Sequence, residues 1–578
     1  MYAYTANFKE GIERNLIMYN KNTSKKNASN KKAWAPRPEK PNKTASKSRQ
    51  GKFVDQMKQT RKKLYYEKIG LPTMDSNLTL TENGAVAYKS SGSALVDINF
   101  KISAMREMEE GQIVALFRKA YAENPRLAMR WLGYLMDIRQ GQGGRRSSMV
   151  ILKDMMKNGG AKIVSQVIEL IPEYGRWDMI YNFTSNPVTS ETIKKMIKKQ
   201  FAEDKANMKA GKPISLLAKW ADSATSRSKE TRKNGLWTVH ALGMTEKQYR
   251  KMLSAMRKHI DVVERKMSSN NWQSIDYETV PSKANLNYNK TFLKHDETRR
   301  RAYLDGLTRG EAKINASVTN PCEILNKYHQ ISGWYSNPDA ALEGMWKALP
   351  NLMEPNKSML VVADGSGSML SRCAGNITCL DVANSLAIYC ADRAKGAFAN
   401  KYITFSMTPK FVEFGKDWSL QRKIKEAERH DECANTNLEA VFDLILKTAI
   451  ANHSPQSDLP ENILIISDMA FDSMCSAGAS RDGYGWLRNV KVTKSFINEI
   501  KARFEAHNYT CPNLIFWNCM GAGRTTTFPI TQDDRGMMVS GFSVNTLKMI
   551  MSGKTDPLYA IMDTICKPRY TPFEKALA

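Results

Sequence analysis

The chain has 578 residues, a formal net charge of +28 at pH 7, 42% apolar residues and 25% charged residues. This length suits two to four globular domains with a large hydrophobic core. The positive charge indicates an anionic partner, with nucleic acid ahead of membrane. No apolar run approaches the roughly eighteen residues that cross a bilayer.

The cysteines and the first residues indicate a cytoplasmic protein. Nine cysteines occur and none forms a C-x-x-C pair, which argues against zinc-ribbon and thioredoxin-like sites. An odd number without framework spacing is typical of free thiols in a reducing compartment. The N-terminus also lacks the apolar core of a signal peptide. We therefore expect a soluble intracellular protein without a membrane partner.

The N-terminal segment differs in composition from the rest of the chain. Residues 1–70 contain 18 Lys and Arg against 5 Asp and Glu. Lys21–Lys52 is rich in Lys, Asn, Ser and Pro and cannot bury enough apolar surface to offset chain entropy. We predict that residues 1–78 are a basic disordered tail, which either binds phosphates through counterion release or remains solvated.

Residues 79–350 have the apolar spacing of helices. Ile113, Leu116, Phe117 and Ala120 follow the i, i+3, i+4, i+7 pattern. Further helices are predicted at Ser147–Lys157, Lys162–Ile171, Glu191–Lys205, Glu246–Lys266 and His295–Leu307. Short turns between them favour a helical bundle or a HEAT-like curved array, although no repeat of fixed length occurs.

Residues 351–578 alternate strands with helices. Strands are predicted at Met359–Asp364, Tyr402–Phe405, Phe411–Phe414, Ile463–Asp468, Leu514–Asn518 and Met537–Ser540, with Phe411–Phe414 as a hairpin partner. Helices are predicted at Leu380–Lys395, Leu438–Ile450, Lys491–Ala506 and Val544–Met551. This alternation predicts a mostly parallel, doubly wound sheet, so the fold class is α followed by α/β.

The predicted strand Met359–Asp364 leads into the loop D-G-S-G-S, which could belong to a phosphate-binding loop, a serine nucleophile or a metal site. A phosphate-binding loop would need a lysine after Gly367, which is absent. A serine nucleophile would need a different elbow and a histidine near a later strand end. A metal site fits better, because carboxylate and hydroxyl oxygens suit Mg²⁺ or Mn²⁺.

The donors for such a metal come from three places in the chain. Asp364, Ser366 and Ser368 share one turn, Thr436 precedes a helix, and Asp468 ends a later strand. Each position is expected at the carboxyl edge of the sheet, where ligands of doubly wound folds bind. This set resembles the metal-ion-dependent adhesion site of von Willebrand factor A domains.

The resemblance implies specific roles for these residues. The two serines would bind the cation directly, the threonine would bind it in one state, and the two aspartates would bind it directly or through water. A sixth position would be left for an acidic group of a protein partner. The sequence departs from the usual pattern at Asn435, where the family generally has glycine.

A second resemblance covers residues 80 to 565. The stretches that carry it are TENGAVAYKSSGSALVDINF from Thr81, WLGYLMDIRQGQGGRR from Trp131, YGRWDMI from Tyr174, VVERKMSSNNWQSIDYETVPS from Val262, HDETRRRAYLDGLTRGEAKIN from His295 and VSGFSVNTLKMIM from Val539. They resemble a family of unknown function in plants, fungi, large DNA viruses and bacteriophages. Its layout is similar to that of the Ro (TROVE) RNA-binding proteins, which join helical repeats to a von Willebrand A domain. This implies an RNA partner, either single-stranded ends or a small structured RNA.

Two basic clusters are candidate phosphate contacts. Their residues are Arg139, Arg145 and Arg146 in a glycine-rich loop, and Lys294, Arg299, Arg300 and Arg301 on a predicted helix. Each cluster could equally be a solvated turn or helix face. The favoured function is a non-enzymatic, Ro-like ribonucleoprotein component with a magnesium-dependent adhesion site. The alternative is a metal-dependent protein-interaction module, or a virion or assembly factor, whose basic surface is incidental.

Overall fold

The computed structural model describes residues 77–81, 86–331, 337–353, 358–405, 409–431, 438–471, 480–481, 487–488, 496–520, 527–531, 536–550 and 556–578. Contacts divide the chain into the units Met1–Leu64 and Tyr65–Ala578, and every described residue belongs to the second. The predicted basic tail therefore lies almost entirely outside the described residues. Within them, no helix is both long and apolar enough to cross a membrane.

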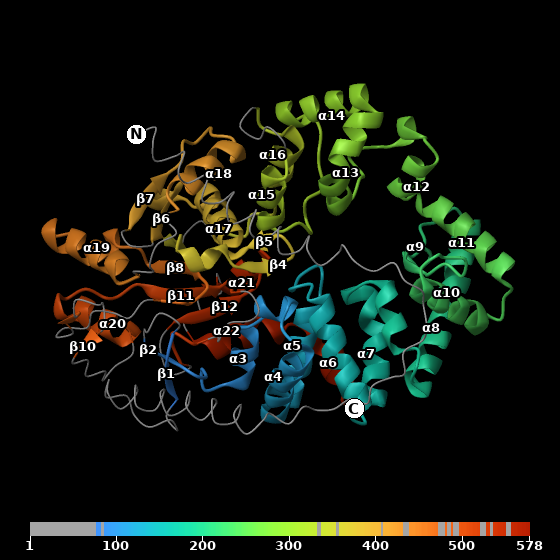
Figure 1. The fold of residues 1–578 in the computed structure, drawn as a ribbon, viewed down its shortest axis with the longest axis horizontal. Coiled ribbons are helices and arrows are strands. Elements are labelled where there is room, and N and C mark those ends of the chain that lie inside the picture. The colour runs from blue at the N-terminus through green and yellow to red at the C-terminus, as the bar shows by residue number, and fades with distance from the viewer. Residues whose placement is uncertain are drawn as a thin grey trace, which may run out of the picture. The chain divides into compact units, whose positions relative to one another are not determined.

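The first part of the described unit is helical (Figure 1). Its helices are α3 (Ala94–Asn99), α4 (Glu110–Glu123), α5 (Pro125–Met136), α6 (Arg145–Lys157), α7 (Ala161–Tyr174), α8 (Pro187–Lys209), α9 (Leu217–Trp220), α10 (Lys229–Leu242), α11 (Glu246–Ile260), α12 (Val263–Ser268), α13 (Ser282–His295), α14 (Glu297–Arg309), α15 (Pro321–His329) and α16 (Ala340–Lys347). The predicted helical region is confirmed.

An Asn-Pro pair begins three of these helices, α5, α8 and α15. The Asn124 side chain accepts a hydrogen bond from the Leu127 amide, and Pro125 occupies the first position of α5. Asn186 and Pro187 start α8 in the same way. The asparagine satisfies amides that have no partner within the helix, while the fixed φ of proline suits its first turn.

The predicted helix Glu246–Lys266 is wrong as a single element, because it is two helices. Asp261 has a φ of 57°, in the left-handed region, and ends α11. Val262 is extended and α12 begins at Val263. Aspartate tolerates this conformation better than most residues, so the apolar periodicity continues across a break that it does not reveal.

The second part of the unit contains a six-stranded mixed sheet with the order β12-β11-β8-β3-β6-β7 (Figure 1). Its strands are β3 (Met359–Asp364), β6 (Lys401–Phe405), β7 (Lys410–Glu413), β8 (Asn462–Ser467), β11 (Asn513–Asn518) and β12 (Met537–Ser540). All neighbours are parallel except β6 and β7, which pair antiparallel as the predicted hairpin.

Helices accompany this sheet, as the alternation predicts. They are α17 (Cys379–Arg393), α18 (Leu420–Arg429), α19 (Leu438–Ala451), α20 (Phe496–Ala506), α21 (Thr546–Ile550), α22 (Pro557–Ile565) and α23 (Thr571–Lys575). The helix α17 packs against β3, β6 and β8, and its middle turns are buried throughout. The α-then-α/β order is thus confirmed.

The C-terminal helices return to the helical part and pack against α5. Arg130 Nε donates to Glu574 Oε2 at 2.5 Å, and Arg569 Nε donates to the buried Asp137 Oδ2 at 2.5 Å. A second buried link joins the Asn518 side chain to the Phe100 carbonyl at 2.9 Å. The last residues and the end of β11 thus both join the helical part to the sheet part, while the domain boundary predicted at 350 stays a prediction.

His329 joins α15 to two helices of the sheet region. Its Nε2 lies 2.6 Å from Glu428 Oε1 and its Nδ1 lies 3.3 Å from Asp381 Oδ1. Burial alone would lower the pKa of His329, but the hydrogen bonds and charges of the two carboxylates outweigh it and raise the pKa to about 9. The imidazolium is therefore the form that this contact stabilises.

We expect His329→Gln to destabilise the protein in a pH-dependent way. Because the pKa rises on folding from 6.5 to about 9, the stabilisation is complete below the lower value and is lost as pH rises through the upper one. The variant should lose about 1–2 kcal/mol at pH 6 and almost nothing at pH 10. Urea unfolding at both pH values checks this, with the exposed His507→Gln as control. An equal loss at both pH values would contradict it.

Candidate functional site

Parallel pairing brings the polar ends of β3 and β8 together. Ala363 lies opposite Ile466 in the register, so the strands end side by side at Asp364 and Ser467. Asp468 follows at once, and both aspartates are almost fully buried. The structure thus unites two of the predicted donors, which lie far apart in the sequence.

The Asp364 carboxylate is tightly held. Its Oδ2 accepts a hydrogen bond from Ser467 Oγ at 2.6 Å, and its Oδ1 accepts one from the Ser366 amide at 2.9 Å. Burial, and then the negative charge of Asp468, raise the pKa of Asp364 to about 7. Within the described ranges, no lysine, arginine or histidine forms an ion pair with Asp364. Asp364 and Asp468 are therefore two neighbouring buried carboxylates, and no basic side chain of the described ranges forms an ion pair with Asp364.

Hydroxyl groups complete this edge of the sheet. Ser366 Oγ lies 3.0 Å from Ser368 Oγ, so the two predicted serine donors are adjacent. Ser366 is buried, whereas Ser368 is partly exposed. After β8, Met469 has a φ of 64°. A non-glycine residue in this region is strained, and such strain clusters at functional sites.

Asp431 is a residue of this site that the sequence did not reveal. A Cβ atom on Gly365 would lie 3.4 Å from Asp431 Oδ1 and 3.0 Å from Thr404 Oγ1, so the loop passes close to a third carboxylate. Asp431 Oδ2 accepts from Asn384 at 2.9 Å, while its buried Oδ1 has no hydrogen-bond partner. Burial, with Glu428 and Asp381, raises the pKa of Asp431 to about 7. No local motif marks this residue.

The remaining predicted donor, Thr436, lies outside the described residues. Among those that the structure describes, no group of three or more His, Cys, Asp or Glu side chains is placed to hold a metal ion. The predicted donors that the structure describes at this edge are therefore two carboxylates, Asp364 and Asp468, and two serine hydroxyls, with Asp431 beside the loop. Such hard oxygen donors suit Mg²⁺ or Mn²⁺ rather than zinc or copper.

The arginines of the glycine-rich loop have different environments. Arg139 lines a cavity of about 770 Å³ and lies 3.8 Å from Glu173. Arg145 donates to Asp178 at 2.9 Å. Arg146 donates to main-chain carbonyls, including that of Met108 at 2.8 Å. Only Arg139 therefore borders an open cavity, while the other two hold the loop and its neighbours.

The residues of the second predicted basic cluster, Lys294 and Arg299–Arg301, also lie in different environments. Arg300 is fully buried, bonds to Asn285 and Asn289 and lies among three aromatic rings, so its guanidinium is out of reach of an external phosphate. Arg299 donates to the Ile275 carbonyl at 2.7 Å. Arg301 pairs with Glu297 in solvent, and Lys294 is exposed.

The positive charge of the protein is concentrated elsewhere. Pro187–Ser268, which spans α8 to α12, contains 19 Lys and Arg against 8 Asp and Glu. With the first seventy residues, this segment accounts for 24 of the 28 net positive charges. A running charge count along the sequence would have found it. We call Pro187–Ser268 the basic helical segment.

The cavity of about 770 Å³ borders this segment and combines basic with aromatic side chains. The Arg176 guanidinium lies over the Trp220 ring at 4.0 Å and also donates to Asp178. Lys195 and Lys199 of α8 line the same cavity and are exposed. Arg176 thus covers one face of the Trp220 ring, and Glu169, Glu173 and Glu203 also line the cavity. Aromatic rings beside cations are a common arrangement for binding unpaired bases and phosphates.

Two family models and one viral protein match parts of this chain. Residues 225–357 match the family model of a domain of unknown function (DUF2828), and residues 358–560 match that of another (DUF7788). Uncharacterized protein L728 of Acanthamoeba polyphaga mimivirus is 27% identical over 517 residues, which cover 83% of this chain and 85% of that protein. The chain is therefore similar to a viral protein along most of its length.

One solved structure is also similar. The crystal structure of the Ro (RSR) protein of Deinococcus radiodurans is 13% identical, with a TM-score of 0.38, over 73% of this chain and 93% of that chain. A TM-score this low does not establish a shared fold.

The environments of Arg300 and Arg301 predict opposite effects of substitution. Arg300→Ala should destabilise the protein by about 3 kcal/mol, because it leaves buried amides unpaired and a cavity among the rings. Arg301→Ala should change stability by about 0.5 kcal/mol or less, since its ion pair is exposed. Urea unfolding of both variants checks this. Equal stabilities would contradict the buried role of Arg300.

Proposed function

We propose that this protein is a non-enzymatic RNA-binding protein, a component of a ribonucleoprotein, which contacts RNA through the basic helical segment. The observation that carries the proposal is the concentration of net charge in that segment. Exposed Lys and Arg side chains release counterions from a phosphate backbone, and this release supplies much of the affinity for nucleic acid. The chain also resembles in sequence a family whose layout is similar to that of the Ro RNA-binding proteins.

The cavity beside Trp220 favours a single-stranded RNA or an unpaired region of a small structured RNA. Stacking on an indole ring requires a base that is not stacked in a helix. The adjoining Lys195 and Lys199 are placed for phosphates of the same strand. A membrane surface would not use such a cavity, so it supports RNA over lipid.

We propose in addition that the sheet region is a von Willebrand factor A domain with a metal-ion-dependent adhesion site. Ser366, Ser368, Asp364 and Asp468 would hold Mg²⁺ or Mn²⁺, with Thr436 joining them from outside the described residues. The paired carboxylates and adjacent hydroxyls fit such a cation, because Asp364 has no cationic side chain of the described chain to balance it. The bound ion would supply a position for a carboxylate of an acidic protein partner.

Hydrolytic chemistry is not part of the proposal. A serine nucleophile requires a base beside its hydroxyl, and within the described residues no histidine is hydrogen-bonded to Ser366 or Ser368. The alternative function, a metal-dependent protein-interaction module or a virion or assembly factor, is favoured by the similarity to a viral protein. EDTA should abolish that interaction and nuclease should leave it intact.

Removal of three exposed lysines from α8 tests the RNA proposal. The full-length variant Lys195→Gln/Lys198→Gln/Lys199→Gln should bind single-stranded RNA about tenfold more weakly at 150 mM salt. The slope of log Kd against log salt should fall by about two units, because each lost phosphate contact removes about 0.7. Fluorescence anisotropy measures both quantities.

The matched control for this test is Lys416→Gln/Lys447→Gln/Lys567→Gln, which removes three exposed lysines elsewhere. It should keep the wild-type affinity and slope. If the two variants weaken binding equally, the affinity comes from net charge and not from the basic helical segment. If the wild type does not bind RNA in low salt, the RNA proposal is wrong.

Removal of the serine hydroxyls tests the cation site. Wild-type protein should bind Mn²⁺ in titration calorimetry and gain thermal stability with Mg²⁺, because a ligand that binds only the folded state stabilises it. Ser366→Ala/Ser368→Ala and Asp364→Ala should lose both effects and retain RNA affinity. The serine variant guards against misfolding, since it keeps the buried carboxylate. Undiminished Mn²⁺ binding by both variants would exclude this site.

A further inference from the structure

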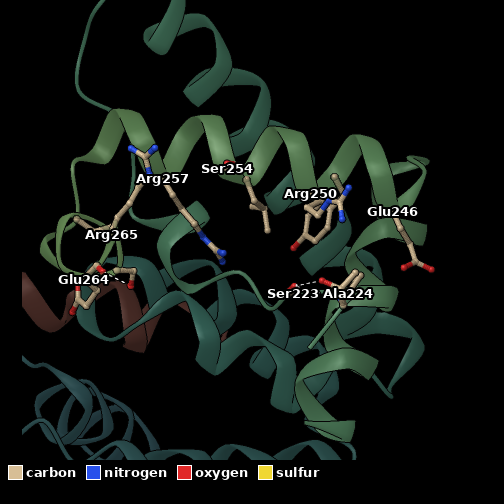
Figure 2. A pocket seen from close by; sticks show the side chains of 13 residues that line it. Ser223, Ala224, Glu246, Arg250, Ser254, Arg257, Glu264 and Arg265 are labelled. Atoms are coloured by element: carbon tan, nitrogen blue, oxygen red, sulfur yellow. Dashed lines mark hydrogen bonds between the residues drawn. The ribbon is translucent and has the colours of Figure 1, made fainter. Parts of the chain in front are cut away.

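A second cavity lies within the basic helical segment, between α11, α12 and the loop at Ser223–Thr225 (Figure 2). Its volume is about 400 Å³. Three arginines line it: Arg250 and Arg257 from α11, and Arg265 from α12. Arg250 and Arg257 are seven residues apart, which places them on one face of the helix about two turns from each other.

One of these arginines is held in place by the backbone. Arg257 Nε donates to the Ala218 carbonyl at 2.8 Å, and its Nη2 donates to the Ala221 carbonyl at 2.7 Å. These two bonds fix the guanidinium across the cavity, and its third nitrogen, Nη1, takes part in neither of them. Figure 2 shows Arg257 extending between Arg250 at one end of the cavity and Arg265 at the other.

The other two arginines of the cavity, Arg250 and Arg265, differ from Arg257 in their contacts. Both side chains are exposed, and neither forms a hydrogen bond or an ion pair with any other residue that the structure describes. An exposed guanidinium costs little to present to an anion, because it is already charged and solvated. Ser254, which is also exposed and lines the cavity, adds a hydroxyl donor between them.

The acidic residues of the cavity do not cancel this charge. Glu264 Oε2 lies 3.9 Å from Lys219 Nζ, whose charge offsets part of the negative charge. Glu246 belongs to the first turn of α11, where a negative charge is favoured, and Figure 2 places it at the far end from Arg265. The three arginines therefore leave an excess of positive charge along the wall of the cavity.

We propose that this cavity is a binding site for a phosphate group of a nucleotide, either at the end of an RNA strand or within its backbone. Guanidinium forks and hydroxyls are the donors that phosphate oxygens prefer. A concave site of about 400 Å³ is at the small end of ligand cavities and admits a single strand rather than a duplex. The inference rests on the proposed RNA-binding function and locates a phosphate contact within it.

The test uses the full chain with Arg250→Gln/Arg265→Gln, because Arg257 has a structural role. The control is Lys251→Gln/Lys258→Gln, which removes the same charge from exposed positions of α11 that do not line the cavity. Anisotropy is measured with single-stranded RNA carrying either a 5′-phosphate or a 5′-hydroxyl. Binding of inorganic phosphate and of a nucleoside monophosphate is measured by calorimetry.

The arginine variant should bind RNA about tenfold more weakly than the lysine control and should lose calorimetric binding of the monophosphate. A loss confined to the 5′-phosphorylated RNA assigns the cavity to a strand end, and an equal loss for both RNAs assigns it to the backbone. Equal affinities of the two variants would overturn the proposal while leaving RNA binding itself intact. If the wild type binds no RNA, the proposed function fails, and the monophosphate titration still decides whether the cavity takes phosphate.

Discussion

In-register parallel pairing of β3 with β8 is the constraint on which the candidate cation site depends. It places the ends of both strands at one edge, so that Ser467 bonds to Asp364 across a separation of 103 residues. A shift of one residue would turn Asp364 to the other face of the sheet and separate it from Asp468. Every residue of β3, and every residue of β8 after the first, is buried, so such a shift would force close-packed side chains to repack. Core packing thus positions the polar loop.

The protein separates two kinds of charge. Carboxylates are buried at the edge of the sheet, where they suit a small hard cation, whereas the lysines and arginines of the basic helical segment lie in solvent, where they suit phosphate. Burial strengthens electrostatic interactions at the first site, and salt weakens them at the second. The C-terminal helices, through Arg569 and Asp137, join the two parts of the chain that carry these surfaces.

The run Arg299–Arg301 shows that a cluster of charges in the sequence does not tell which of its side chains are exposed. Consecutive residues on a helix point about 100° apart, so the three arginines face a carbonyl group, a core of aromatic rings and solvent. A cluster of charges in the sequence therefore does not predict a charged surface. The break at Asp261 is similar, because the periodicity of α11 and α12 is continuous while one left-handed residue divides them. The net positive charge of α8 to α12, by contrast, can be counted directly from the sequence.

The sequence by itself determined the local features of this protein. Apolar periodicity predicted the helices, the alternation after residue 350 predicted the parallel sheet, and the D-G-S-G-S loop with Asp468 predicted hard oxygen donors at its edge. Only the tertiary structure decided that Asp431 lies beside Gly365, that Arg300 is buried, and that Arg250 and Arg265 share a cavity. The physical reason is that periodicity and strand ends are set by neighbouring residues. Contacts between distant segments depend on how whole helices and strands pack.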